Sequence, residues 1–150
     1  MLFRSDAEAA TSQADLSRDE TFAIQAFAWA GVQQKKGKSP VYLYNFNRAL
    51  PAHTPATAFG AFHSGEIVYA YDNLHTLDRP WEAADRKLAT EMSSYWLNFV
   101  KTGNPDGKGL PHWPAFTTTV GQVMLLEENL RAVPNPGMKR LEWLHRLYSR

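Results

Sequence analysis

The chain has 150 residues and a formal net charge of +1, from 16 basic and 15 acidic side chains. Its length is compatible with one domain, and the small net charge gives no electrostatic case for a nucleic-acid or anionic-membrane partner. Because there is no cysteine, disulfides, thiolate metal sites and cysteine nucleophiles are excluded, and the compartment stays undetermined. No apolar run reaches the roughly 18 residues that a membrane-spanning helix requires.

Two helices are expected before Gly37. Ser5 can cap the first, which runs to about Leu16, with Glu8 three residues later completing a capping box. Asp19 opens the second, which runs to about Gln34 and is stopped by Gly37. Apolar residues surround much of this second helix, so we expect it to be covered on several sides. They are Phe22, Ile24, Ala26, Phe27, Trp29, Ala30 and Val32.

The stretch "PVYLYNF", residues 40–46, is the strongest candidate for a β-strand. It is rich in β-branched and aromatic residues, and proline and polar residues bound it. Both of its alternating faces are apolar, which is typical of a strand covered on two sides inside a parallel sheet. Residues 48–59 contain two prolines and are predicted to form a loop.

Four further elements are expected downstream. The stretch "IVYAYDNL" has the local propensity of a strand, although a short helix stays open. A long helix spans about 81–101 and ends before Gly103, because its apolar residues have helical spacing. "QVMLL", residues 122–126, is a short strand, and a final helix covers about 137–148.

These elements predict an α/β fold in which the sheet is incomplete. Mostly helices surround only two strands, and one long strand with one short strand does not form a stable sheet between helical layers. We therefore expect the chain to be a portion of a larger unit. The aromatic fraction of 13% is high, which indicates a thick core or a large contact surface.

No local motif supplies a complete catalytic site. The nucleophile elbow G-x-S-x-G does not occur. Ser64 is adjacent to His63, but neighbouring side chains point apart, and Ser93 and Ser94 lie within a predicted helix without a base at helical spacing. The histidines form neither H-x-H nor H-E-x-x-H, and "DGKGLP" does not open a helix after a strand, so we predict no metal site and no phosphate loop.

His63 lies in "GAFHSGEI", residues 60–67. Small residues surround it, which allows the backbone to approach closely, and it follows a buried strand, where catalytic residues of α/β sheets lie. Glu66 could meet it within one helical turn. On these local features alone, His63 is a candidate, and an ordinary histidine remains the alternative.

Four segments, in order, resemble the C-terminal part of the type B carboxylesterases, the cholinesterase-like and para-nitrobenzyl esterase-like group of α/β-hydrolases. Residues 5–46 resemble the family's helix pair and late sheet strand. "GAFHSGEI" resembles its catalytic-histidine motif, in which a glutamate follows the histidine by three residues. "YWLNFVKTGNPDGKGLPHWPAF" resembles its helix, turn and WP segment, and "QVMLL" with the final helix matches its last strand and closing helix.

The resemblance implies that His63 is the general base of a Ser–Glu/Asp–His triad in a carboxylic ester hydrolase. Glu66 is then a structural residue beside the site, and "IVYAY" is helical. Residues 1–150 become the C-terminal portion of one α/β-hydrolase domain, with the nucleophile, the triad acid and the oxyanion loop upstream; Asp72 and Asp78 follow the histidine and fit the acid's role poorly. Losing the serine or the histidine of a related triad lowers kcat by about 10⁶, so we expect the isolated chain to be inactive.

The resemblance also implies the partners. They are a small-molecule carboxylic ester and the upstream catalytic portion of the same protein, with no cofactor, nucleic acid or membrane. Exposed apolar surface would favour self-association of the isolated chain. Two alternatives are a non-catalytic cholinesterase-like binding or adhesion segment, which an upstream sequence without the serine would favour, and a free-standing helical interaction module, which would be a monomer that unfolds cooperatively.

Overall fold

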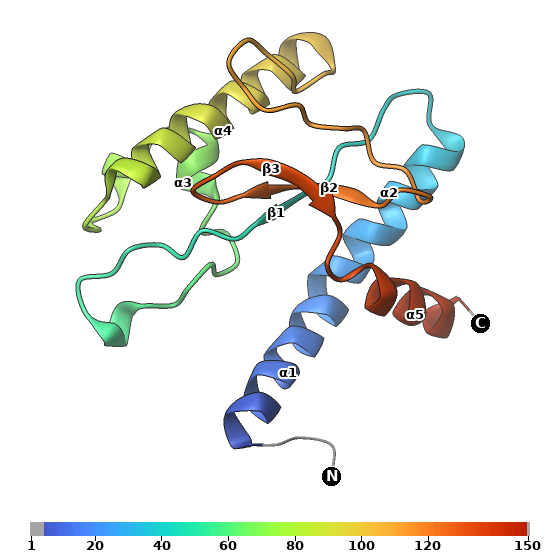
Figure 1. Cartoon of the computed structure of the whole chain (residues 1–150), viewed down its shortest axis with the longest axis horizontal. Helices are drawn as coiled ribbons and strands as arrows, with labels where there is room; N and C mark the ends of the chain where they lie inside the picture. The colour runs from blue at the N-terminus through green and yellow to red at the C-terminus, as the bar shows by residue number, and fades with distance from the viewer. Residues whose placement is uncertain (1–4, 150) are drawn as a thin grey trace.

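A three-stranded sheet with helices on both faces organises the chain, and the computed structural model describes residues 5–149 (Figure 1). The helices and strands, in chain order, are α1 (Asp6–Arg18), the π-helical segment η1 (Asp19–Ala23), α2 (Ile24–Lys36), β1 (Tyr44–Phe46), the 3₁₀ turn η2 (Pro55–Thr57), α3 (Ile67–Ala70), the 3₁₀ turn η3 (Leu74–Thr76), α4 (Ala83–Thr102), β2 (Gln122–Leu126), β3 (Arg131–Pro134) and α5 (Met138–Tyr148).

The first two predicted helices are one continuous helical rod (Figure 1). Ser5 caps it as predicted, because its hydroxyl accepts the Glu8 N–H at 3.2 Å. Asp19 does not begin a second helix, and that expectation was wrong. Its side chain is turned into the structure, where Arg18 and Arg140 bind it, so it is not available as a cap. The helix bulges into a π segment at this point and continues to Lys36 before Gly37, as predicted.

Only one face of α2 is covered within residues 5–149. Ile24, Phe27 and Ala30 are buried, whereas Trp29 is 79% exposed and Val32 is 55% exposed. The expected cover on several sides is therefore not supplied by the part of the chain that the structure describes. An apolar side of this helix remains open to solvent.

The sheet has the order β1–β2–β3. Strand β1 is parallel to β2, as its two-sided apolar pattern predicted, and Tyr44 pairs with Met124. Strand β2 has the predicted bounds, and it forms an antiparallel hairpin with β3, which raises the strand count from the predicted two to three. Strand β3 was missed because it has four residues, the last of which is a proline.

Strand β1 is shorter and more exposed than predicted. Three residues of the stretch 40–46 pair as a strand, and they lie at the edge of the sheet. Tyr44 and Asn45 are exposed, because within residues 5–149 no strand lies on the far side of β1. The sequence pattern of an interior strand is thus found at a sheet edge.

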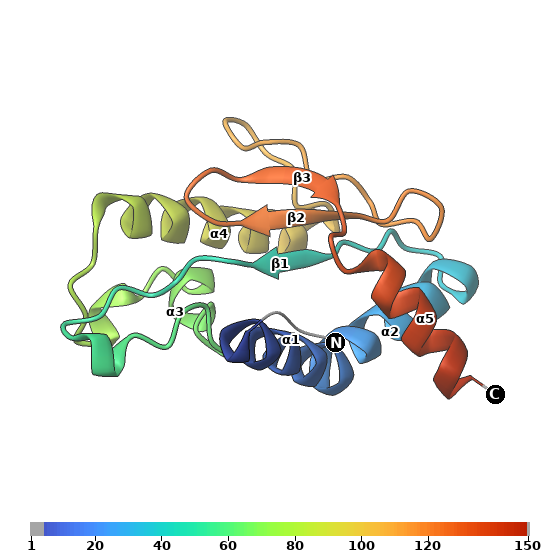
Figure 2. The same ribbon diagram turned by 60° about the horizontal axis from the view of Figure 1, so that its bottom comes forward.

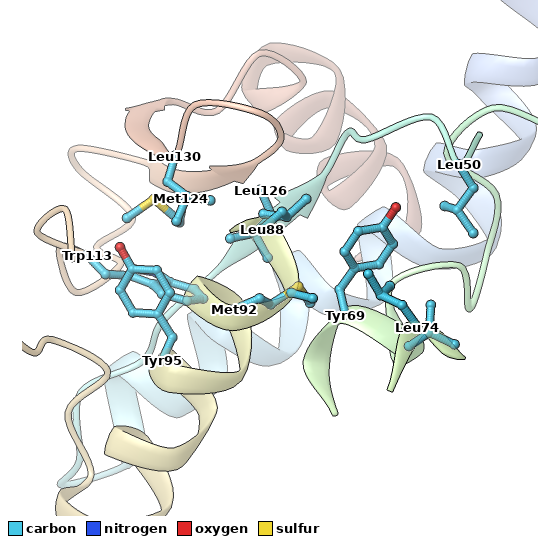
Figure 3. Packing of buried hydrophobic residues seen from close by; sticks show 12 residues of the cluster. Leu50, Tyr69, Leu74, Leu88, Met92, Tyr95, Trp113, Met124, Leu126 and Leu130 are labelled. Carbon is cyan, nitrogen blue, oxygen red and sulfur yellow. The ribbon is translucent and has the colours of Figure 1, made fainter. Parts of the chain in front are cut away.

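Two separate cores lie on the two faces of the sheet. Met124 and Leu126 are fully buried with Leu88 and Met92 of α4 and Tyr69 of α3 (Figure 3). On the other face, α2 and α5 pack against each other and against the segment that enters β1 (Figure 2). The buried residues of this second core are Ile24, Phe27, Ala30, Phe116, Leu141 and Leu144.

The remaining helices agree with their expected types. The stretch "IVYA" is helical as α3, in line with the family resemblance and against its local propensity. Helix α4 ends at Gly103, whose φ of +76° is a left-handed value that glycine adopts without strain. No helix among residues 5–149 combines the length and the apolar character that crossing a bilayer requires.

Truncating Leu88, which is 1% exposed in the α4 core, should lower the free energy of unfolding by about 2–5 kcal/mol in the Leu88→Ala variant. Val100 lies on the same helix at 80% exposure, so Val100→Ala should change it by less than about 0.5 kcal/mol. Urea denaturation followed by tryptophan fluorescence measures both. Equal effects of the two variants would contradict the described core.

Candidate functional site

His63 lies on a tight exposed turn between the long loop that follows β1 and the start of α3. The Gly65 N–H donates to the Phe62 carbonyl at 3.0 Å and closes the turn. Ser64, directly after the histidine, has a φ of +69°, which is uncommon for a residue with a side chain. Strained backbone of this kind is concentrated at functional sites, and here it holds His63 at the exposed tip of the turn.

Phe22 stacks on the imidazole of His63. The two ring centroids are 4.4 Å apart and the ring planes differ by 19°. Phe22 lies in η1, and π-helical segments are frequent at functional sites because they displace one side chain from the regular helical register. One face of the imidazole is therefore covered, while within residues 5–149 neither ring nitrogen has a hydrogen-bond partner.

Glu66 is close in sequence to His63 but does not bind it. Its backbone begins α3, where its carbonyl accepts the Ala70 N–H at 2.9 Å. Among the described residues, no hydrogen bond or ion pair joins the Glu66 carboxylate to the imidazole, so the expected meeting within one turn is not realised. Partial burial raises the pKa of Tyr44 on β1, and the charge of Glu66 raises it further.

The other candidates from the sequence lie apart from His63. The Asp78 carboxylate is 3.4 Å from His53, and both side chains are exposed. Ser93 and Ser94 lie in α4 and donate their hydroxyls to the Thr90 carbonyl. Residues 5–149 hold no group of three or more histidine or acidic side chains that could bind a metal ion. None of these side chains is brought to the imidazole.

A buried carboxylate, Asp85, binds residues on either side of the segment that carries His63. Arg48 donates to both of its oxygens, Nε to Oδ1 at 2.7 Å and Nη2 to Oδ2 at 3.1 Å. The Tyr69 hydroxyl donates to Oδ1 at 2.8 Å and the Glu82 N–H to Oδ2 at 2.9 Å. Burial favours a higher pKa for Asp85, but the hydrogen bonds from Arg48, Glu82 and Tyr69 outweigh it and hold the pKa below its ordinary value.

This ionic cluster was not found from the sequence, although a signal was present. Asp85 falls on the same helical stripe as Leu88, Met92 and Tyr95, all buried on α4. An acidic residue on an apolar stripe needs a buried partner, and Arg48, directly downstream of β1, supplies it. The stack of Phe22 on His63 had no such signal, because it depends on how the N-terminal helix is packed.

The fold and the order of these elements agree with those of known carboxylesterases. The model of the Carboxylesterase family matches residues 4–142, so the chain belongs to the carboxylesterase family. Its three-stranded sheet and flanking helices form part of an α/β-hydrolase fold.

Individual relatives give the same assignment. Carboxylesterase 4A of Bos taurus is 35% identical over 129 residues, covering 77% of this chain and 23% of that protein. Para-nitrobenzyl esterase of Bacillus subtilis (strain 168) is 28% identical over 137 residues, covering 89% and 27%. The solved structure of a thermophilic para-nitrobenzyl esterase superposes with a TM-score of 0.76 at 25% identity, over 89% of this chain and 27% of that one. The chain thus spans about a quarter of the length of these relatives.

The stack of Phe22 on His63 can be tested by proton NMR. A proton above an aromatic face is shielded, so the ring protons of His63 should lie upfield and move downfield in the Phe22→Leu variant. Phe99→Leu is the matched control, because Phe99 contacts Tyr42 on α4's side of the sheet and should leave these resonances unchanged. Identical His63 shifts in the wild type and in Phe22→Leu would contradict the stack.

Proposed function

We propose that this chain supplies the general base of a carboxylic ester hydrolase and that His63 is that base. The observation that carries the proposal is an exposed imidazole, held on a strained turn, at the position of the histidine motif in a chain of the carboxylesterase family. The substrate would be a small-molecule carboxylic ester. Residues from the rest of the protein would complete the site.

The chemistry requires an imidazole with two usable ring nitrogens. One nitrogen takes the proton of a serine hydroxyl as that oxygen attacks the ester carbonyl, and later returns the proton to the leaving alcohol. The other donates to a carboxylate that orients the ring. Both nitrogens of His63 lack a protein partner within residues 5–149, and Phe22 restricts the ring from one face, which suits this double role. Glu66 would act as a structural residue that begins α3 behind the turn.

The role of His63 can be tested by joining this chain to upstream carboxylesterase sequence that carries a G-x-S-x-G elbow; this protein is called the joined protein below. We expect it to hydrolyse short-chain nitrophenyl esters. Loss of the base should lower kcat in His63→Ala by about 10⁶, the loss measured for an analogous triad.

His53→Ala is the matched control, because His53 is an exposed histidine in the loop before His63 and its side chain pairs with Asp78. Its activity should equal that of the joined protein. Full activity in the His63→Ala variant would rule out His63 as the base. A folded joined protein with an intact elbow that does not hydrolyse these esters would also contradict the proposed role, whereas a native upstream sequence without a serine at the elbow would favour the non-catalytic binding alternative.

We further propose that an extended strand from the upstream portion of the same protein pairs with the free edge of β1. Met124 N–H donates to Leu43 O and Asn47 N–H to Leu126 O, each at 2.9 Å. In a parallel ladder, alternate residues of a strand face the partner. The N–H and C=O groups of Tyr44 and Phe46 therefore face the opposite edge and are available to a further strand.

Apolar grooves lie on both faces of this edge. On the α4 side, aromatic rings surround a groove of about 230 Å³; its residues are Tyr42, Tyr44, Tyr95, Trp96, Phe99, Val100, Pro105 and Trp113. On the α2 side lies a second groove, lined by Ala26, Trp29, Ala30, Val32, Gln33, Val41 and Leu43. An added strand would place alternate side chains into the two grooves and cover both. The quarter-length coverage of the relatives supports an occupant from the same protein.

Without that strand, we expect the isolated chain to self-associate through the β1 edge. Tyr44→Pro removes an N–H that is not needed for pairing with β2, so it should reduce association while keeping the fold. Tyr44→Thr also removes the ring but keeps the N–H, and it should still associate. Sedimentation velocity measures both, and a wild-type chain that stays monomeric with a sharp thermal transition would contradict the proposal.

A further inference from the structure

We propose that Asp85 is a positioning residue for His63, because this one buried carboxylate binds the chain on both sides of the histidine turn. The inference rests on the proposed function of His63. Asp85 is fully buried, and both of its oxygens accept two hydrogen bonds. Two of its donors, Arg48 and Tyr69, bracket the segment that contains the turn.

On the upstream side, Arg48 fixes the point where the chain leaves the sheet. Its guanidinium forms a two-pronged pair with Asp85, and Nη2 also binds the Glu82 carboxylate at 2.7 Å. Two parallel N–H···O bonds define an orientation as well as a distance, which a single contact does not. The side chain of Arg48 is 17% exposed, and its contacts with these acids fix the position from which the following loop begins.

On the downstream side, Tyr69 fixes the start of α3. Its ring is fully buried in the α4 core, and its hydroxyl donates to the same carboxylate oxygen that the Arg48 Nε binds. Burial raises the pKa of this phenol, and the bond to Asp85 raises it further, so Tyr69 stays a donor. Figure 3 shows the Tyr69 ring projecting from α3 into the core beside Leu50 and Leu74.

Between Arg48 and Tyr69, short contacts connect the histidine turn to the two ends of the segment that Asp85 holds. Leu50 N–H donates to Gly60 O at 3.2 Å, and the Leu50 side chain is so close to Gly65 that an added Cβ there would lie 3.0 Å from it. Arg79 donates to Pro51 O at 2.9 Å and lies 5.5 Å from the centre of the Phe62 ring. A displacement of Arg48 or Tyr69 would therefore reach the residues on both sides of His63.

Replacing Asp85 with asparagine keeps the size of the side chain but removes one of the two oxygens that accept hydrogen bonds. An asparagine offers one oxygen and one NH₂ group. The NH₂ group would therefore face N–H donors whose hydrogen bonds the second carboxylate oxygen now accepts. We expect the anchored ends to loosen and the turn to move while the distant α2–α5 core keeps its packing.

Amide hydrogen exchange of the chain tests this directly. In Asp85→Asn, the amides of Leu50 and Gly65 should exchange faster by about tenfold or more, the effect of losing a hydrogen bond to a charged group, while amides of α2 and α5 keep their rates. Tyr69→Phe removes a single bond to the carboxylate and should give the same pattern with a smaller amplitude. Asp106→Asn is the matched control at the far end of α4, where Asp106 binds the Trp113 N–H, and it should leave the turn unchanged.

In the joined protein, Asp85→Asn should lower kcat by about tenfold with KM unchanged, since the base is displaced while substrate contacts remain. Faster exchange throughout the chain in Asp85→Asn and in Tyr69→Phe would overturn the positioning role, and so would an unchanged kcat in Asp85→Asn when His63→Ala is inactive. The two readouts separate the proposals: if the turn loosens but His63→Ala is fully active, Asp85 still anchors the turn and the proposed function is the part that fails.

Discussion

The ion pair between Arg48 and the fully buried Asp85 is the interaction on which the arrangement around the site depends. A carboxylate without partners would be very unfavourable in the core between α4 and the sheet, so its burial requires Arg48, Tyr69 and the Glu82 N–H at the same time. Each partner belongs to a different segment. The pair thereby specifies where the chain leaves β1, where α3 begins and how α4 starts, and the histidine turn lies within these limits.

A second constraint comes from the open edge of β1. The stretch 40–46, which contains β1, has apolar side chains on both faces, and each face opens into a groove that the described residues leave uncovered. Trp29 and Tyr44, which line these grooves, are 79% and 42% exposed. A sheet that continues beyond β1 would bury these rings and satisfy the free backbone groups in one step. In that proposed arrangement, the aromatic side chains around β1 would form an internal contact surface.

Much of the fold could be predicted from the spacing of apolar residues and from the glycines that end helices. The strand 122–126 and the helices closed by Gly103 and Gly37 follow from local chemistry, and the structure has them. The helical state of "IVYA" did not follow from local chemistry, because its β-branched and aromatic residues favour a strand; tertiary packing of Tyr69 onto α4 decides it. The unbroken rod α1–η1–α2 was mispredicted because Asp19 looks like a cap and instead pairs with arginines.

The candidate site was predictable only in part. The motif around His63 singles out the residue, but its local features left an ordinary histidine open, and only the resemblance gave it a role. The contact between Phe22 and His63 joins two segments that no short-range pattern connects, and it depends on the π segment. Asp85 could have been suspected from its place on an apolar stripe, whereas its link to the histidine turn required the positions of Arg48 and Tyr69.

The most direct test of His63 as the base compares two titrations of the joined protein. NMR follows the protonation of the His63 imidazole in the enzyme, and kinetics follows the acidic limb of kcat/KM for a neutral ester. If His63 must be neutral to take the serine proton, the two midpoints should coincide and shift together when salt is added. An acidic limb whose midpoint differs clearly from that of His63 would contradict its assignment as the base.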